Sequence, residues 1–252
     1  MTESLPERYF EAMGRVLAQI REGQQPSLAR AAAAIAGAAE RGGVWHLFDT
    51  GHMLTHEMIG RAGGPMMLAP IRWQFELQHD VRPRGPRPQD GPPRVFLDEV
   101  GGLHRWILTQ ADLRPGDVLL INSVSGVNTL PVSLAIDARE AGLTVIGLTS
   151  VAYSSSLAPV NPMGKRLYEV VEILLDHGAP PGDALVDVAG LEGAICPASG
   201  IAAAYLMWAL VAAVVDRLQR GGKTPSIYVS NHLPGAKRLN EEARGRFLAQ
   251  GF

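Results

Sequence analysis

Small polar side chains gather in the segment 123–128, which reads Ser-Val-Ser-Gly-Val-Asn. The apolar run 118–121 before it has the composition of a buried strand, and a helix is expected to begin near Asn128. Free N–H groups and the positive dipole end at a helix N-terminus favour a phosphate or a carboxylate. Ser123, Ser125 and Asn128 are therefore candidate anion-binding residues. The alternative is an ordinary Ser or Asn helix cap.

Two residues that could transfer protons follow another apolar run, 44–48. His52 falls in the turn after this run, and histidine titrates close to neutral pH. Glu57 lies in an expected helix over 53–62, where it could act as a general base. The alternatives are a loop histidine that hydrogen-bonds the backbone, and a solvated Glu57–Arg61 pair at i,i+4 spacing.

Further hydroxyl groups follow later apolar runs. Thr149 and Ser150 come directly after the run 144–148, and Ser199 opens a long apolar segment. Ligands of open parallel sheets bind at the carboxyl ends of the strands, so these residues are expected at one edge of the sheet. For Ser199, a helix N-cap is the main alternative to a ligand contact.

Hydrophobic periodicity indicates alternating strands and helices, which is typical of a doubly wound α/β fold. The strand–helix–strand order of residues 44–70 requires a parallel pair. The pattern does not give the strand order. Strands are expected at 44–48, 65–70, 118–121, 144–148 and within 167–175, and helices at 5–21, 26–41, 53–62, 96–110, 130–141, 199–217 and 236–249.

The Pro- and Arg-rich segment 82–94 cannot form a regular element. A long loop of this kind is a lid, an oligomer contact or a mobile insert. We expect a single domain over 1–252, with a helical pair at 1–42, an α/β core at 43–222 and a C-terminal extension at 223–252.

Composition narrows the class of protein. The 252 residues are 46% hydrophobic and 19% charged, which is enough apolar material for one sizeable core. The net charge of −2 gives no long-range attraction to nucleic acid or to an anionic membrane surface. The lone Cys196 excludes an internal disulfide, and the start of the chain shows no signal peptide, so a cytoplasmic protein is expected. The apolar run 201–215 is short for a membrane span and predicts a buried helix.

The order of motifs resembles the sugar isomerase (SIS) domain family, in particular a bacterial branch with a Gly-Ser-Gly-His-Ser loop. Asp-Thr-Gly-His-Met at 49–53 takes the place of that loop, and Arg-Ala-Gly-Gly follows at 61–64. The branch's Ser-Asn-Ser-Gly-Arg-Asn loop is similar to 123–128. Its Thr-Ser-x-Ala-Tyr-Ser and Gly-Lys-Arg-Leu-Tyr motifs are similar to 149–154 and 164–168. The resemblance extends over nearly the whole chain.

The resemblance implies a three-layer sandwich with a five-stranded parallel, flavodoxin-like sheet, and a protein that dimerises. It also implies a site for a sugar or sugar phosphate, with Ser and Thr side chains of the first two loops on the phosphate. By position, the binding residues would be Thr50, Ser123, Ser125, Asn128, Thr149, Ser150 and Ser199. A homo-oligomer, a dimer or a tetramer, is expected because the early helices and the segment 201–215 offer apolar surface.

Isomerases of this superfamily move a proton between C1 and C2 of a sugar through an enediol, which needs a base and a second group. Glu57 lies in a Glu-x-x-Gly-Arg segment that resembles the one with the catalytic Glu of sedoheptulose-phosphate isomerases, and His52 is the candidate second group. The resemblance implies a phosphosugar isomerase or, alternatively, a non-catalytic sugar-phosphate sensor, with no cofactor. The His52–His56 spacing would make a metal site only with a third ligand such as Asp49, and no metal is expected.

Three of the departures from the pattern of the branch bear on the binding of an anion. Asp49 and Met53 replace a Gly and a Ser in the first loop, and Val127 replaces an Arg in the second. A carboxylate beside a phosphate is repulsive by roughly one to a few kcal/mol at short range. Asp49 could instead face a sugar hydroxyl, a metal or solvent. The loop 123–128 is therefore expected to be the better of the two half-sites.

Overall fold

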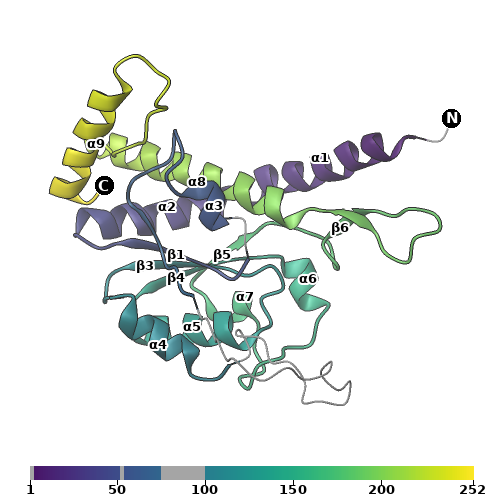
Figure 1. Ribbon diagram of the computed structural model, residues 1–252. Helices are drawn as coiled ribbons and strands as arrows, with labels where there is room; N and C mark the ends of the chain where they lie inside the picture. Colours follow the sequence, from purple (N-terminus) through teal and green to yellow (C-terminus); the bar gives the residue numbers. More distant parts are fainter. Residues whose placement is uncertain (1–2, 52–53, 75–99) are drawn as a thin grey trace, which may run out of the picture.

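The computed structural model describes residues 3–51, 54–74 and 100–252 (Figure 1). The expectations for His52, for Met53 and for the segment 82–94 lie outside these residues.

The described residues contain a five-stranded parallel sheet with the strand order β2-β1-β3-β4-β5. This confirms the predicted α/β class and adds the strand order. Every residue of β3 is buried, because β3 is a central strand with helices over both of its faces. The strands are β1 (Trp45–Asp49), β2 (Leu68–Pro70), β3 (Val118–Asn122), β4 (Thr144–Thr149) and β5 (Ile173–Asp176).

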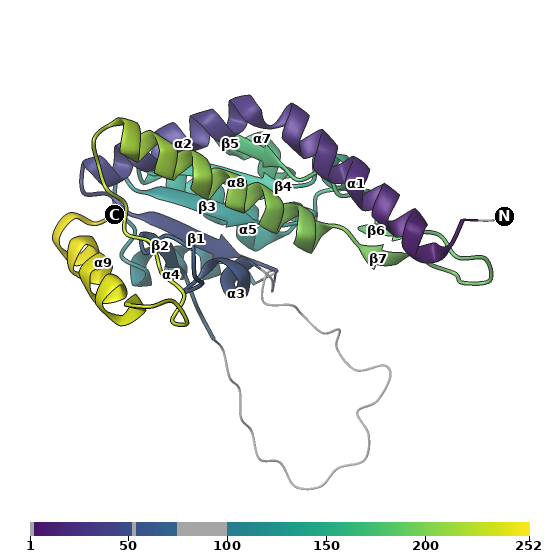
Figure 2. The ribbon, with the colours of Figure 1, turned by 90° about the horizontal axis from the view of Figure 1, so that it is seen from above.

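Helices cover both faces of the sheet, so the molecule has three layers (Figure 1, Figure 2). Helices α1, α2 and α8 lie on one face, and the short α3 packs against α8. Helices α4, α5 and α7 lie on the other face. The helices are α1 (Leu5–Gly23), α2 (Gln25–Glu40), α3 (Leu54–Met58), α4 (Leu103–Gln110), α5 (Thr129–Glu140), α6 (Val151–Ser155), α7 (Leu167–Val170), α8 (Ser199–Arg220) and α9 (Ala236–Gln250).

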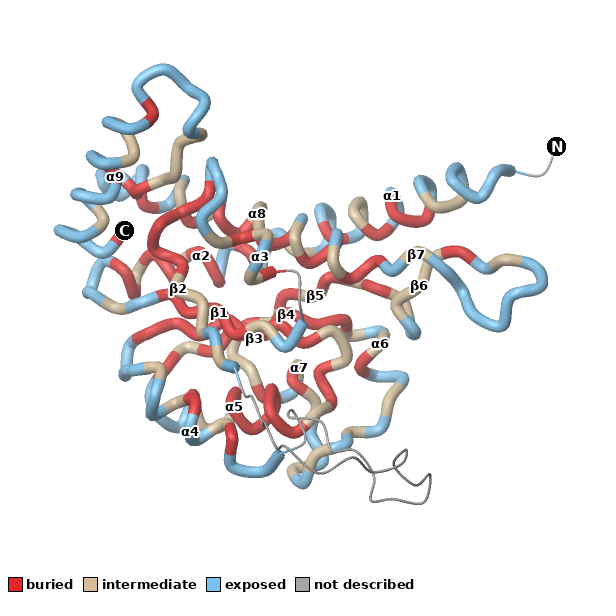
Figure 3. The backbone as a smooth tube through the Cα atoms, viewed as in Figure 1, coloured by how far each residue is buried: buried red, intermediate tan, exposed pale blue. Residues whose placement is uncertain are grey.

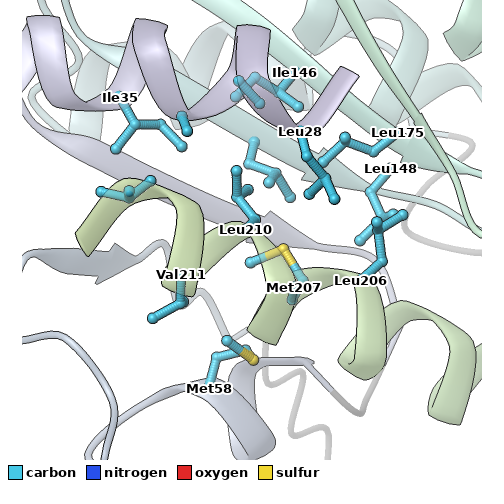
Figure 4. Packing of buried hydrophobic residues seen from close by; sticks show 14 of the residues in the cluster. Leu28, Ile35, Met58, Ile146, Leu148, Leu175, Leu206, Met207, Leu210 and Val211 are labelled. Atoms are coloured by element: carbon cyan, nitrogen blue, oxygen red, sulfur yellow. The ribbon is translucent and has the colours of Figure 1, made fainter. Parts of the chain in front are cut away.

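Among the described residues, helix α8 lies in the larger of two hydrophobic clusters, one on each face of the sheet. The buried residues of both faces are red in Figure 3. Leu206 and Met207 of α8 are fully buried in the same cluster as Leu28 and Ile35 of α2 (Figure 4). By length and composition alone, α8 could span a membrane. Its packing between α2 and α3 is that of a core helix, as the run 201–215 predicts.

Some expected elements differ from the structure. The helix expected over 53–62 ends at Met58, because the chain turns at Gly60, where φ is +72°. The segment 167–175 contains the expected strand, β5, but its first residues form the helical turn α7. The carboxylate of Glu169 stabilises this turn by accepting from Arg166 N (2.6 Å).

The segment before α8 is rich in Gly and Pro, and it contains an antiparallel hairpin of β6 (Ala184–Val186) and β7 (Ile195–Pro197), which is absent from the expected strands. The hairpin lies beside α1, and the two project beyond the sheet (Figure 1, Figure 2). We call the N-terminal half of α1 and this hairpin the arm. Phe10 on the arm is 69% exposed.

Candidate functional site

The candidate site lies where β1 and β3 end. The helices that follow these neighbouring strands cover opposite faces of the sheet, α3 on one side and α5 on the other. In a sheet with this strand order, the crevice between two such strands is where ligands bind. Asp49 and Asn122, the last residues of the two strands, are paired in register at this point.

The Asp49 carboxylate closes the first turn of the site. Its Oδ1 accepts from Gly51 N (2.9 Å) and from Asn122 Nδ2 (2.7 Å). Its Oδ2 accepts from Leu54 N (3.0 Å) and Thr55 N (3.3 Å), at the start of α3. An external anion would need these same amides. The chain's own carboxylate therefore occupies the anion position of the first turn, and its four hydrogen bonds use the lone pairs that a metal ion would need.

Thr50 follows Asp49 and is exposed. Its N–H and its Oγ1–H both donate to the Asn122 carbonyl oxygen, over 3.1 and 3.0 Å. The hydroxyl can still accept a hydrogen bond from a ligand, but its proton is engaged. The next residue is Gly51, where an added Cβ would lie 3.0 Å from Asp49 Oδ1. A side chain at this position would therefore press on the Asp49–Asn122 pair.

The second loop, 123–128, offers backbone donors. Within the described structure, the N–H groups of Ser125, Gly126 and Val127 donate to no other residue, and the twelve-residue helix α5 begins just after them. Gly126 has φ +60°, and a Cβ there would lie 2.9 Å from Thr149 Oγ1. Such a turn of unengaged amides at a helix N-terminus can hold a phosphate.

The side chains of this loop differ in accessibility. Ser123 is 4% exposed, and its N–H donates to Leu148 O (3.0 Å). Ser125 and Asn128 are half-buried, and Asn128 is the N-cap residue of α5. Ser125 and Asn128 are therefore the two polar side chains of the loop that solvent reaches.

Thr149 and Ser150 lie beneath this loop and are fully buried. Thr149 Oγ1 donates to Val124 O (3.1 Å), and Ser150 Oγ donates to Ala179 O (2.5 Å). Ser150 Oγ also accepts from Tyr153 N (3.1 Å), so Ser150 is the N-cap of α6. Their hydroxyl protons are thus engaged inside the protein, and the two residues brace the loop from below.

Ser199 lies at the start of α8 and is 8% exposed. Its Oγ donates to Asp183 Oδ2 (2.7 Å), and its N–H donates to Asp183 Oδ1 (2.7 Å). Asp183 therefore caps α8 from outside the helix. Ser199 also reaches the site, because it lines a cavity of about 40 Å³ together with residues of both loops. The lining residues are Gly51, Leu54, Asn122, Val124, Ser199, Gly200 and Ala203.

Glu57 projects from α3 toward α8. Its Oε1 accepts from Trp208 Nε1 (3.1 Å), and its Oε2 pairs with Arg61. The Glu57 side chain is 27% exposed, while that of Arg61 is 56% exposed. The structure thus contains the predicted Glu57–Arg61 pair, and both carboxylate oxygens are directed to residues outside the loop 123–128. His52, the proposed second group, lies outside the described residues.

A wider cleft of about 690 Å³ opens beside the first turn, between α3 and the segment that follows β2. Asp49 and Gly51 contribute to its wall next to the site. His56 and Arg72 are exposed and line the same cleft, which gives it two side chains able to carry positive charge. The cleft is therefore a second location at which an anion could bind.

Sequence reasoning missed three residues of this site: Asn122, Asp183 and Trp208. Asn122 ends an otherwise apolar run, and a buried amide there must find partners. Trp208 lies within an apolar helix, and a buried indole N–H needs an acceptor. For Asn122 and Trp208, the sequence thus indicates that a partner is needed but does not identify it.

The fold defines a doubly wound α/β protein, and the candidate site is the crevice between β1 and β3. The family model of the SIS domain matches residues 8–150, more than half of the chain. The chain therefore belongs to the SIS-domain family, as the motifs predict. A UPF0309 protein of Shouchella clausii is 31% identical over 249 residues, which cover 98% of both chains. A UPF0309 protein of Brucella canis is 34% identical over 250 residues, which cover 98% of this chain and 97% of that one.

Among solved structures, the phosphoheptose isomerase of Neisseria gonorrhoeae is similar, with a TM-score of 0.49 and 15% sequence identity. The match covers 86% of this chain and 100% of the isomerase chain. This similarity concerns the fold alone.

Proposed function

We propose that this protein binds a sugar phosphate in the β1/β3 crevice, with the anion on the loop 123–128. The observation that carries the proposal is the set of unengaged amides at Ser125, Gly126 and Val127, at the N-terminus of α5. Asp49 fills the corresponding position of the first turn, which leaves the second loop for an external anion. Membership of the SIS family favours a sugar phosphate over other anions.

Side chains around the crevice would complete the binding site. Ser125 is accessible beside the unengaged amides, and its hydroxyl can donate to a phosphate oxygen. Asn128 lies at the end of the same loop and is a further candidate contact. Thr50 can accept from a sugar hydroxyl, because its own proton is directed to the β3 carbonyl. Ser123 and Ser199 are buried at the edges of the crevice, where they would shape the site more than bind the anion.

We further propose aldose–ketose isomerisation with Glu57 as the general base. The carboxylate would take the proton from C2 of the open-chain aldose and return it to C1, while a hydroxyl proton moves from O2 to O1. His52 is the proposed carrier of that second proton. The exposed Arg61 makes a surface pair with Glu57, worth roughly half a kcal/mol. Glu57 could therefore exchange Arg61 for a substrate at little cost.

A non-catalytic sugar-phosphate sensor is the second candidate. The contacts of Glu57 favour it, because Trp208 and Arg61 engage both carboxylate oxygens. A sensor would keep the anion loop 123–128 and would respond to the ligand through protein contacts, without turnover. The two candidates share the binding site and differ in proton exchange.

A thermal-shift screen tests the binding proposal, because a ligand of the native state raises Tm by mass action. The screen compares glucose 6-phosphate, fructose 6-phosphate and sedoheptulose 7-phosphate with their unphosphorylated parents and with inorganic phosphate. We expect the phosphosugars to raise Tm more than their parents do. A response to neutral sugars alone would contradict the placement of an anion on the loop 123–128.

Incubation of the bound phosphosugars in D2O separates the isomerase from the sensor. An isomerase incorporates deuterium at the carbon that receives the proton, and NMR detects the exchange. Glu57→Gln should abolish incorporation and leave the thermal shift unchanged, because the amide cannot take the proton. Binding without incorporation in the wild-type protein would contradict the isomerase and support the sensor.

We also propose a cytoplasmic homo-oligomer, a dimer or a tetramer, in which a second copy covers the arm. The arm exposes Leu5 (40%), Phe10 (69%), Leu191 (58%) and Ile195 (37%), a set of apolar side chains on a projecting element. Light scattering at micromolar concentration should give the mass of two or four chains. The mass of one chain would contradict the proposal.

A further inference from the structure

Asn122, a residue that lines the small cavity of the site, has a buried acceptor without a partner in the described part of the chain. Asn122 is 5% exposed, and its Oδ1 has no hydrogen-bond partner among the residues that the structure describes. Asn122 lines the cavity of about 40 Å³, which has room for one water molecule or one hydroxyl group. Buried polar atoms are almost always paired, so this oxygen lacks a donor that a ligand could supply.

The Asp49 carboxylate determines which end of the Asn122 amide faces the cavity. A carboxylate can only accept, so the NH2 group must point to it, and Nδ2 lies 2.7 Å from Asp49 Oδ1. The amide oxygen is thereby turned away from Asp49. The reverse orientation would bring two oxygens together and lose the hydrogen bond. The acceptor character of the cavity is therefore set by Asp49.

The other polar group of the cavity has the same character. Ser199 Oγ gives its proton to Asp183 Oδ2 and so presents only lone pairs to a ligand. The charge of Asp49 behind Asn122 adds a negative potential. A phosphate is too large for this space and has the wrong charge. A hydroxyl or an amino group fits, because it is small and donates.

We propose that this cavity binds one hydroxyl or amino group of the sugar phosphate, which donates to Asn122 Oδ1, and that Asp49 is the residue that positions Asn122. The inference rests on the proposed function and adds the orientation of the ligand. The donor group enters between α3 and α8, and the phosphate stays on the loop 123–128. Val124 belongs to that loop and also lines the cavity, so the two subsites are adjacent.

Calorimetric titration with fructose 6-phosphate, glucose 6-phosphate, sedoheptulose 7-phosphate and inorganic phosphate tests the inference. Asn122→Leu removes the acceptor at similar volume. Its affinity for the phosphosugar that the wild-type protein binds best should fall about tenfold, roughly 1.4 kcal/mol. Its affinity for inorganic phosphate should stay unchanged, because the anion subsite is not altered.

Asp49→Asn is the second variant, for the case that Asn122→Leu does not fold. The new amide can donate to Asn122 Oδ1, so Asn122 can turn its NH2 group into the cavity. The phosphosugar affinity should again fall about tenfold, and the affinity for inorganic phosphate should not fall. The matched control is Asn240→Leu. Asn240 is a part-buried amide of α9 that bonds Val229 N (2.8 Å) and O (2.9 Å), and its loss should lower stability without changing either affinity.

Unchanged phosphosugar affinity in the folded variants would overturn the inference. A parallel loss of phosphate affinity in Asn122→Leu would also overturn it, because the anion would then depend on Asn122. If the wild-type protein binds neither the phosphosugars nor phosphate, the proposed function itself fails, which is a different result.

Discussion

Asn122 Nδ2 donates to Asp49 Oδ1 over 2.7 Å, between register partners at the ends of β3 and β1. This hydrogen bond joins the two loops of the site. The Asp49 carboxylate also occupies the anion position of the first turn. An external anion would therefore bind at the loop 123–128. The crevice thus has an acceptor side at Asn122 and a donor side at the amides of Ser125, Gly126 and Val127.

Gly126→Ala should disrupt the anion loop. The added Cβ would lie 2.9 Å from Thr149 Oγ1 and 3.1 Å from Leu167 Cβ, and overpacking of this kind costs about 1–3 kcal/mol. Gly164→Ala is the control, because Gly164 has nearly the same φ (+61°) but nothing within 4 Å. Urea unfolding should show a larger loss of stability for Gly126→Ala than for Gly164→Ala. Phosphate titration should show at least a tenfold loss of affinity for Gly126→Ala and none for Gly164→Ala. Equal effects of the two variants would contradict the tight packing of the loop.

Gly51→Ala should disturb the Asp49–Asn122 hydrogen bond. Its Cβ would lie 3.0 Å from Asp49 Oδ1 and 3.6 Å from Asn122 Nδ2, so the pair must shift. We expect a lower Tm and a several-fold weaker binding of phosphosugars. Gly14→Ala, at an open position within α1, should instead raise stability by up to about 1 kcal/mol. A Gly51→Ala variant with wild-type Tm and affinity would argue against the role of this pair.

Trp208→Phe should separate the positioning of Glu57 from ligand binding. Phe retains most of the apolar packing and removes the donor to Glu57 Oε1, which costs about 1 kcal/mol of stability. If Glu57 is the base, the rate of deuterium incorporation should fall at least tenfold with unchanged phosphosugar affinity. Trp106→Phe, on α4 at the opposite face of the sheet, should leave both quantities unchanged. The same incorporation rate in Trp208→Phe and wild type would refute the positioning role.

The buried His177 should make the folded protein less stable at mildly acidic pH. The side chain is fully buried, and burial lowers its pKa from 6.5 to about 4, although Asp176 and Asp183 partly oppose this shift. Between these pH values the unfolded chain binds more protons than the folded one, so the contribution of His177 is present above pH 6.5 and is lost as the pH falls toward 4. The loss should reach about 3 kcal/mol at most. Urea unfolding from pH 7.5 to 5 should give a flatter pH dependence for His177→Gln than for the wild-type protein, and parallel curves would contradict this.

The class of fold could be predicted because local periodicity reports burial. The apolar spacing of 199–217 already indicates a core helix, and the run 118–121 a central strand. Strand order and the hairpin before α8 depend on pairing between distant segments, which periodicity does not encode. At the site, the chemistry of the loop 123–128 is local and could be recognised. The role of Asp49 could not, because its partner Asn122 is 73 residues away.

The contacts of Glu57 illustrate the same limit. The spacing to Arg61 predicts their pair, since residues four apart share one face of a helix. Trp208, the other partner, is 151 residues away and meets Glu57 only because α3 packs on α8. Whether Glu57 acts as a base depends on this tertiary contact as much as on the local motif.

A crystal structure of the protein with fructose 6-phosphate, or with the phosphosugar that raises Tm most, tests the central claim most directly. The account predicts phosphate oxygens at hydrogen-bonding distance, about 2.7–3.2 Å, from the amides of Ser125, Gly126 and Val127, with the Asp49–Asn122 hydrogen bond intact. A phosphate bound between His56 and Arg72 in the wider cleft, or at the first turn with Asp49 displaced, would contradict it.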